Sequence, residues 1–185
     1  MSVEKTNSSK SVLKVFLPWQ DEDEEKWLEM MSAKGWQLMS AVPFFYSFHK
    51  IPPKQTIVRL DYKNTWHKDY QEYLVTFSDA GWTLLTTLGN WHYFSINPQN
   101  EVVPEIYNSN RAKANKYRRL LIGLSPILLC LVGPFAHAFD FGSQTAISGL
   151  DIALRVIYLL AAFLFIYSFL RVCIKLILLK TNHRE

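Results

Sequence analysis

The feature that most constrains this chain is a pair of apolar segments in its last third. Residues 120–139 carry no charged side chain, and residues 152–170 carry only Arg155. About twenty apolar residues in a helix cover the ~30 Å hydrocarbon core of a bilayer. We therefore expect transmembrane helices over 120–139 and 152–170, joined by the short polar segment 140–151. Two buried helices of a soluble protein are the alternative, but such helices normally keep a polar face.

Basic residues flank both apolar segments and predict their orientation. Five precede the first segment and form a predicted membrane-surface cluster: Arg111, Lys113, Lys116, Arg118 and Arg119. Four lie at or beyond the end of the second: Arg171, Lys175, Lys180 and Arg184. Because residues 120–154 contain no lysine or arginine, the positive-inside rule predicts a multi-pass cell-membrane protein with both termini in the cytoplasm.

The positive charge favours a lipid partner over nucleic acid. The formal net charge is only +4, and the flanks of the two segments account for much of it. We expect the cluster before the first segment to face the anionic lipid of the inner leaflet. Arg155 lies about one turn inside the outer interface, where it would snorkel to the headgroups. An intramembrane charge that pairs with a partner acid is the alternative.

The residues before the apolar segments are sufficient for one small domain. We expect a mobile polar tail over 1–11 and a cytoplasmic domain over 12–96. A linker with a basic juxtamembrane segment follows over 97–119. Beyond the second span, 171–185 is predicted to be a basic cytoplasmic tail.

The domain contains an internal repeat, over 12–50 and 56–96. At an offset of 46 residues the identical pairs include Leu28/Leu74, Ser32/Ser78, Gly35/Gly81, Trp36/Trp82, Leu38/Leu84 and Phe48/Phe94. Each half predicts a strand, a helix that ends at the glycine, and a hairpin. The acidic run 21–25 is interpreted as the start of the first helix. The predicted fold is therefore α+β, with duplicated strand–helix–hairpin units forming a ferredoxin-like type of sheet with two helices.

Candidate binding residues lie on the predicted sheet. Arg59 and Asp61 share the outer face of one strand, although a cross-strand charge pair would explain them equally simply. Trp91, Tyr93 and Phe45 fall on the face opposite Phe94 and Phe48. Exposed aromatic side chains gathered there would mark a recognition surface.

The sequence offers no recognisable catalytic or metal-binding pattern. Its five histidines lack metal-ligand spacing, its two cysteines form no spaced pair, and no phosphate loop or nucleophile elbow is present. We therefore expect no metal, no cofactor and no enzymatic activity. An enzyme acting on membrane substrates would have to rest on Asp61 and His92.

Several short motifs, in their combined order, resemble the DUF2812 family. They are the helix start Glu24-Glu25-Lys26-Trp27-Leu28, the pairs Gly35-Trp36 and Gly81-Trp82, the strand Arg59-Leu60-Asp61-Tyr62, and Trp91-His92-Tyr93-Phe94. The resemblance covers residues 13–96. It implies a bacterial protein of unknown function with a cytoplasmic domain followed by membrane spans, in a regulated membrane response, and it implies no catalytic residues.

Two functions follow as expectations. The first is a non-enzymatic, membrane-tethered recognition or regulatory protein whose aromatic domain binds a protein partner or small ligand, in a regulated envelope response. The alternative is a small accessory or immunity-type protein that acts through its transmembrane hairpin.

Overall fold

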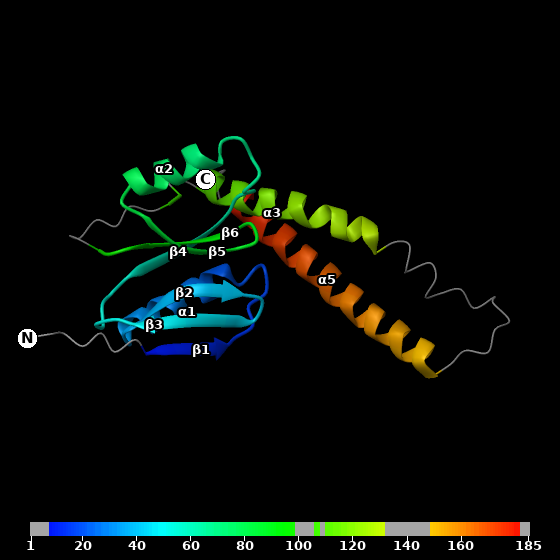
Figure 1. Cartoon of the computed structure of the whole chain (residues 1–185). Helices are drawn as coiled ribbons and strands as arrows, with labels where there is room; N and C mark the ends of the chain where they lie inside the picture. Colours follow the sequence, from blue (N-terminus) through cyan, green and yellow to red (C-terminus); the bar gives the residue numbers. More distant parts are fainter. Residues whose placement is uncertain (1–7, 99–105, 108–109, 132–148, 182–185) are drawn as a thin grey trace, which may run out of the picture. The chain divides into compact units, whose positions relative to one another are not determined.

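The computed structural model describes residues 8–98, 106–107, 110–131 and 149–181 (Figure 1). The chain divides into two compact units, Met1–Ser109 and Asn110–Glu185. The boundary between them falls inside the predicted linker 97–119.

The first unit contains two strand–helix–hairpin repeats, in the order expected from the sequence. The first repeat comprises β1 (Ser9–Leu13), α1 (Asp21–Ala33), β2 (Trp36–Val42) and β3 (Phe45–Lys50). The second comprises β4 (Ile57–Tyr62), α2 (Tyr70–Asp79), β5 (Thr83–Leu88) and β6 (Trp91–Ile96). Each repeat forms its own antiparallel sheet, with strand orders β1-β3-β2 and β4-β6-β5. The fold is therefore α+β.

Local geometry is duplicated along with the element order. Gly35 and Gly81, which follow α1 and α2, have φ angles of 81° and 86°, a left-handed conformation that glycine adopts without steric cost. Pairing in the first hairpin shifts register between Leu38 and Ser40. The second hairpin shifts between Leu84 and Thr86, 46 residues later. A β-bulge thus recurs at the same place in both repeats.

The single ferredoxin-like sheet expected from the sequence is not what the structure shows, because the two sheets remain separate. At the edge of the second sheet, α1 carboxylates occupy the place of a neighbouring strand. Glu25 Oε1 accepts the Leu60 backbone N–H at 2.8 Å, and Glu29 Oε1 accepts that of Val58 at 3.0 Å. An edge strand whose N–H groups are already bonded cannot pair with a further strand at those positions.

The N-terminal strand begins earlier than predicted. β1 starts at Ser9, inside the segment 1–11 that we expected to be a tail, and pairs with β3 from Ser9↔His49 to Leu13↔Phe45. Ser9, Lys10 and Ser11 are exposed, so the strand lacks the apolar alternation by which it could be recognised. Backbone pairing with β3, rather than side-chain burial, holds this end of the strand.

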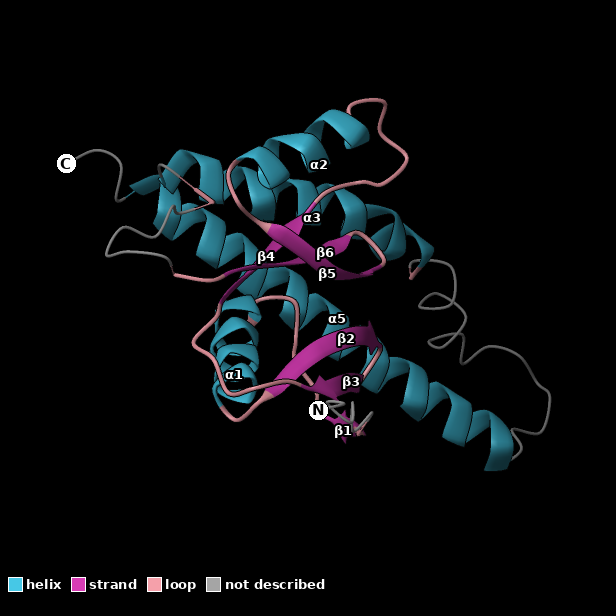
Figure 2. Ribbon diagram, turned by 60° about the vertical axis from the view of Figure 1, so that its left-hand side comes forward, coloured by secondary structure: helices cyan, strands magenta, loops and turns pink. Residues whose placement is uncertain are grey.

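The second sheet is covered on both faces. Figures 1 and 2 show α2 on one side of β4, β5 and β6, and the first repeat on the other. On the α2 side, Phe77 stacks on Phe94 with ring centroids 4.2 Å apart. The other side contributes to the main core, whose buried members are Leu28, Met31, Leu38, Ala41, Tyr46, Phe48, Val58, Leu60 and Tyr93. The core therefore joins the two repeats.

The second unit consists of two described helices, α3 (Asn110–Cys130) and α5 (Gly149–Thr181), which pack together. The Tyr158 hydroxyl donates a hydrogen bond to the Leu131 carbonyl. The ring of Tyr117 lies 5.1 Å from Lys116 Nζ and 4.9 Å from Lys175 Nζ. The contacts of Tyr158 with Leu131 and of Lys175 with Tyr117 link the two helices.

Among the described residues, one helix, Gly149–Thr181, is long and apolar enough to cross a membrane. It contains the predicted span 152–170 and continues through the first part of the predicted tail 171–185, as far as Thr181. Of the predicted span 120–139, residues 120–130 are helical. Residues 132–139 and most of the predicted loop 140–151 lie outside the described residues.

Candidate functional site

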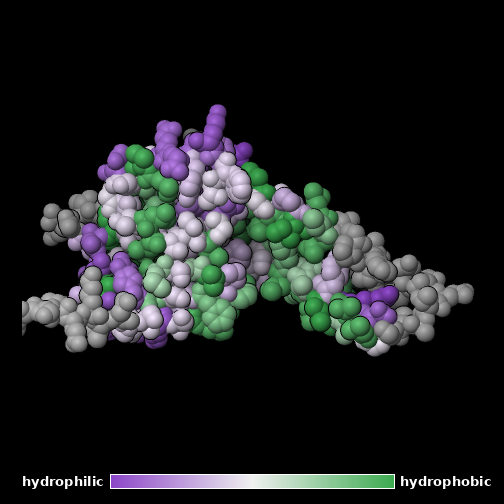
Figure 3. Space-filling model, in the orientation of Figure 1, coloured by the Kyte–Doolittle hydropathy of each residue, from purple (hydrophilic) through white to green (hydrophobic). Residues whose placement is uncertain are grey.

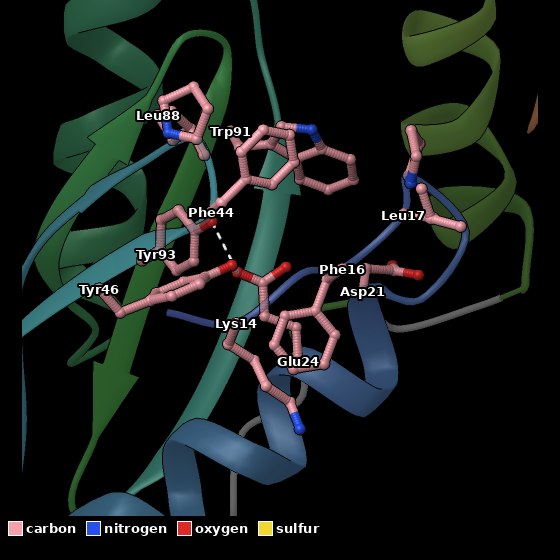
Figure 4. A pocket seen from close by; sticks show the side chains of 12 residues that line it. Lys14, Phe16, Leu17, Asp21, Glu24, Phe44, Tyr46, Leu88, Trp91 and Tyr93 are labelled. Atoms are coloured by element: carbon pink, nitrogen blue, oxygen red, sulfur yellow. Dashed lines mark hydrogen bonds between the residues drawn. The ribbon is translucent and has the colours of Figure 1, made fainter. Parts of the chain in front are cut away.

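A cavity of about 210 Å³ opens in the first unit where both repeats meet (Figure 4). Its walls come from the segment after β1, the first turn of α1, the β2–β3 turn, and strands β3, β5 and β6. Five of its lining residues are aromatic: Phe16, Phe44, Tyr46, Trp91 and Tyr93. The charged lining residues are Lys14, Asp21 and Glu24. The cavity is thus an aromatic pocket with two acids on one helix.

Glu24 is the central polar group of this pocket. Its Oε1 accepts hydrogen bonds from the hydroxyls of Tyr46 and Tyr93, both at 2.7 Å. The side chain is only 7% exposed, and burial raises the pKa of its carboxyl despite the two hydroxyl donors. Burial and the neighbouring Glu24 charge raise the pKa values of both tyrosines, which therefore remain neutral donors.

The second oxygen of Glu24 is differently placed. Among the described residues, none donates a hydrogen bond to Oε2, and no fully buried side-chain oxygen lacks a partner. Oε2 is therefore accessible, and the cavity that Glu24 lines is the space it faces. Figure 4 shows the carboxylate between the two tyrosine hydroxyls and the side of the cavity where Asp21 lies.

Asp21 adds a second negative charge to the same wall. It is one helical turn before Glu24, so both side chains project from one face of α1. Asp21 is buried, and its charge contributes to the raised pKa of Glu24. Lys14 is exposed, with Nζ 5.7 Å from the centroid of the Phe16 ring.

At the position in the second repeat that corresponds to Glu24, the structure has Tyr70, which is hydrogen-bonded to His92. The Tyr70 hydroxyl lies 2.9 Å from His92 Nε2, and His92 Nδ1 lies 3.0 Å from the Asn90 carbonyl oxygen. Since a carbonyl only accepts, Nδ1 carries the proton. Burial lowers the pKa of the imidazole, so the ring is neutral, and Nε2 accepts from Tyr70.

Two of the predicted binding residues, Asp61 and Tyr93, are buried in the interior of the first unit. Asp61 is 2% exposed and accepts hydrogen bonds from the hydroxyls of Tyr73 and Tyr107. Tyr93 is buried because the first repeat covers its face of the sheet. The expectation that these two residues lie on an exposed surface is therefore wrong, although Tyr93 and Trp91 do line the cavity.

The other two predicted binding residues lie apart from the cavity. Arg59 Nη1 lies 2.9 Å from Glu29 Oε1 and 3.8 Å from Glu25 Oε2, so it belongs to the α1–β4 edge. Phe45 is 49% exposed and pairs with Leu13 and Val42 on neighbouring strands. Leu13 and Val42 are exposed too, which makes a small apolar patch on the first sheet.

The predicted membrane-surface cluster is not uniformly exposed. Arg118 is exposed, Lys113 and Arg119 are half-buried, and Lys116 is buried beside Tyr117. Lys116 Nζ lies 5.1 Å from the centroid of the Tyr117 ring, and contact of this cluster with lipid stays a prediction. The side chain of Arg111 lies outside the described residues.

Sequence reasoning missed Glu24, Asp21 and Tyr46. The run 21–25 does form the first turn of α1, as predicted. Four acids in that turn exceed what capping needs, however, and the spacing of Asp21 and Glu24 puts them on one face. That spacing was the available signal. What the sequence could not show is that Tyr46 and Tyr93, from different repeats, converge on one of those acids.

Comparison with known proteins identifies a family and nothing closer. No curated protein and no solved structure matches the chain. One family model, described as a protein of unknown function (DUF2812), matches residues 20–132. The match runs from the start of α1 to the end of α3, and so includes both pocket acids, Tyr46 and Tyr93. Because it covers more than half of the sequence, this chain belongs to the DUF2812 family.

Proposed function

We propose that the first unit is a ligand-recognition domain held at the cell membrane by the C-terminal helices, and that ligand occupancy adjusts an envelope response. The observation that carries the proposal is the cavity at Glu24. A buried carboxylate with an accessible oxygen is costly to maintain in a core. Such an arrangement is typical of a binding site, in which few convergent polar groups sit among aromatic walls.

The apolar surface of α5 supports the membrane part of the proposal. Only 17% of the most apolar 18-residue stretch of α5 is buried. Figure 3 shows hydrophobic residues predominating on the visible surface of the C-terminal helices. Large apolar side chains are exposed along its length, among them Leu150, Ile157, Phe163, Leu170 and Ile177. A helix that is apolar all round needs lipid or another helix as its surroundings.

The finer proposal is a two-span hairpin with both termini in the cytoplasm. Basic residues at both cytoplasmic ends would then contact anionic inner-leaflet lipid. We would test this in a background with serine in place of Cys130 and Cys173. Single cysteines at Ser143 and Ser11 would be labelled in intact cells with a membrane-impermeant maleimide. Labelling of Ser143→Cys alone is expected, and labelling of both, or of Ser11→Cys alone, would contradict the orientation.

The ligand-recognition proposal is tested by filling the cavity. Leu88 lines it, and Leu88→Phe adds a ring to that wall. Leu84→Phe, on the same strand but outside the cavity lining, is the matched control. Full-length proteins would be purified from cells under native conditions, and co-purifying small molecules would be compared by mass spectrometry. A compound enriched with wild type and Leu84→Phe, and depleted with Leu88→Phe, is expected. Identical profiles for all three proteins would refute the proposal.

A further inference from the structure

We propose that the Glu24 cavity binds a compact organic cation, an amine or quaternary ammonium group, against the Glu24 and Asp21 carboxylates. The inference rests on the proposed ligand-recognition function and names the chemical class of its ligand. It is carried by the geometry of the cavity, in which two acids on one helix face and five aromatic rings surround the same space.

The charge balance of the cavity favours a cation, because its lining carries two acids, Asp21 and Glu24, against one lysine, Lys14. Oε1 of Glu24 already accepts both tyrosine hydroxyls, and Oε2 faces the cavity. Among the described residues, no lysine, arginine or histidine forms an ion pair with Glu24. A negative charge at 7% exposure is therefore neutralised by no described basic side chain. A cationic ligand would gain Coulomb energy in this low-dielectric space, whereas an anion would be repelled by both acids.

The aromatic walls suit an organic cation in particular. A cation within about 6 Å of a ring centroid is attracted by the negative face of the ring, and quaternary ammonium groups are recognised in aromatic cages on this basis. At the same wall, Lys14 Nζ lies 5.7 Å from the centroid of the Phe16 ring, within this range. Neutral tyrosine hydroxyls and the Trp91 ring add polarisable surface without adding positive charge.

The size and donor set argue against two other occupants. The cavity of about 210 Å³ is smaller than the roughly 300–1,000 Å³ typical of drug-sized ligands, so the bound group must be compact. A hard metal ion would require about six to eight oxygen ligands. The described residues contain no group of three or more histidine, cysteine, aspartate or glutamate side chains placed to hold a metal.

The test uses choline, tetramethylammonium and the uncharged isostere of choline in which carbon replaces nitrogen. Binding to the full-length protein in detergent would be measured by calorimetry at constant ionic strength. We expect at least one of the two cations to bind more than tenfold tighter than the neutral isostere. Glu24→Gln keeps an oxygen acceptor for the two tyrosine hydroxyls. It should weaken the binding of that cation by more than tenfold. Asp23→Asn, an exposed acid on the same helix turn, should leave its affinity unchanged.

Each outcome decides the proposal. Equal affinity for choline and its isostere, no binding of either cation, or wild-type affinity in Glu24→Gln would overturn it. If Glu24→Gln does not fold, as judged by circular dichroism, Asp21→Asn and Trp91→Leu provide the same comparison. The ligand-recognition function is judged separately, because the Leu88→Phe profile of co-purifying compounds holds whatever the charge of the ligand. If the depleted compound is neutral or anionic, the proposal of a cationic ligand is overturned, whereas the proposal of a ligand-recognition domain is retained.

Discussion

The Tyr70 hydroxyl and His92 Nε2, 2.9 Å apart, occupy in the second repeat the positions that Glu24 and Tyr46 occupy in the first. Both pairs join the first turn of a helix to the last strand of its hairpin, and both positions are shifted by 46 residues. A hydrogen bond between helix and sheet is therefore part of the duplicated unit. Its chemistry has diverged, since only the first copy places a carboxylate beside a cavity.

Aromatic contacts follow the same correspondence. The rings of Trp27 and Tyr46 are 5.0 Å apart, and those of the equivalent Tyr73 and His92 are 5.5 Å apart. The second repeat encloses its polar pair under α2, whereas the first leaves Glu24 at the junction of the repeats. We infer that the second copy of the contact serves packing and the first is available for binding.

The buried His92 should make stability depend on pH in a defined direction. Burial lowers its pKa below the ordinary value of 6.5. Between the lowered pKa and about 6.5 the unfolded chain binds more protons than the folded one, so stability rises with pH and is lost as pH falls through that window. His92→Gln should remove this part of the pH dependence. Urea unfolding of the full chain, followed by tryptophan fluorescence, would measure it.

Fluorescence reports on the relevant unit, because all six tryptophans lie within residues 1–109. His49→Gln, in the first sheet, is the control and should keep the wild-type slope. A His92→Gln protein with an unchanged slope would show that the imidazole is not neutral in the folded state.

Glu24 should make stability depend on pH in the direction opposite to that of His92. Its folded pKa is raised above 4.5, so between about 4.5 and that raised pKa the folded chain holds a proton that the unfolded chain has released. Stability is therefore lost as pH rises through the folded pKa. Glu24→Gln should flatten this loss, and Asp23→Asn should not. The same unfolding titration, repeated across the acid range, would reveal the difference, and an equal loss in wild type and Glu24→Gln would contradict it.

The sequence was sufficient for the repeat but not for the way the two copies meet. Glycines at helix ends, turn residues and strand alternation are local signals, and they predicted the element order of both repeats. Docking of one repeat on the other is a tertiary event with no local period. It buried Tyr93 and brought it to Glu24, 69 residues away. The separation of the sheets likewise depends on long-range bonds from α1 to β4.

The α1–β4 edge can be tested through Glu29. Its Oε1 accepts both the Val58 N–H and an Arg59 N–H, at 3.0 and 2.9 Å. Glu29→Ala leaves a part-buried backbone donor without this acceptor, so we expect a loss of about 1–3 kcal/mol in the free energy of unfolding. Asp23→Ala, an exposed acid of the same helix, should cost less than about 1 kcal/mol. Equal costs in urea unfolding would mean that the carboxylate does not support the strand edge.

Two glycines have left-handed backbones but different surroundings. Alanine substitutions at both would therefore separate the cost of the left-handed conformation from the cost of a steric clash. A Cβ at Gly35 would lie 2.7 Å from the Ile51 carbonyl oxygen, whereas at Gly89, with φ of 58°, it would meet nothing within 4 Å. Gly89→Ala should therefore cost only the left-handed conformation, about 1–2 kcal/mol. Gly35→Ala adds an overlap with backbone that cannot swing away, for a total of about 2–5 kcal/mol. Matching losses for the two variants in thermal and urea unfolding would show that the chain after β3 moves freely from the end of α1. A larger loss at Gly35 would show that this glycine fixes the connection between the two repeats.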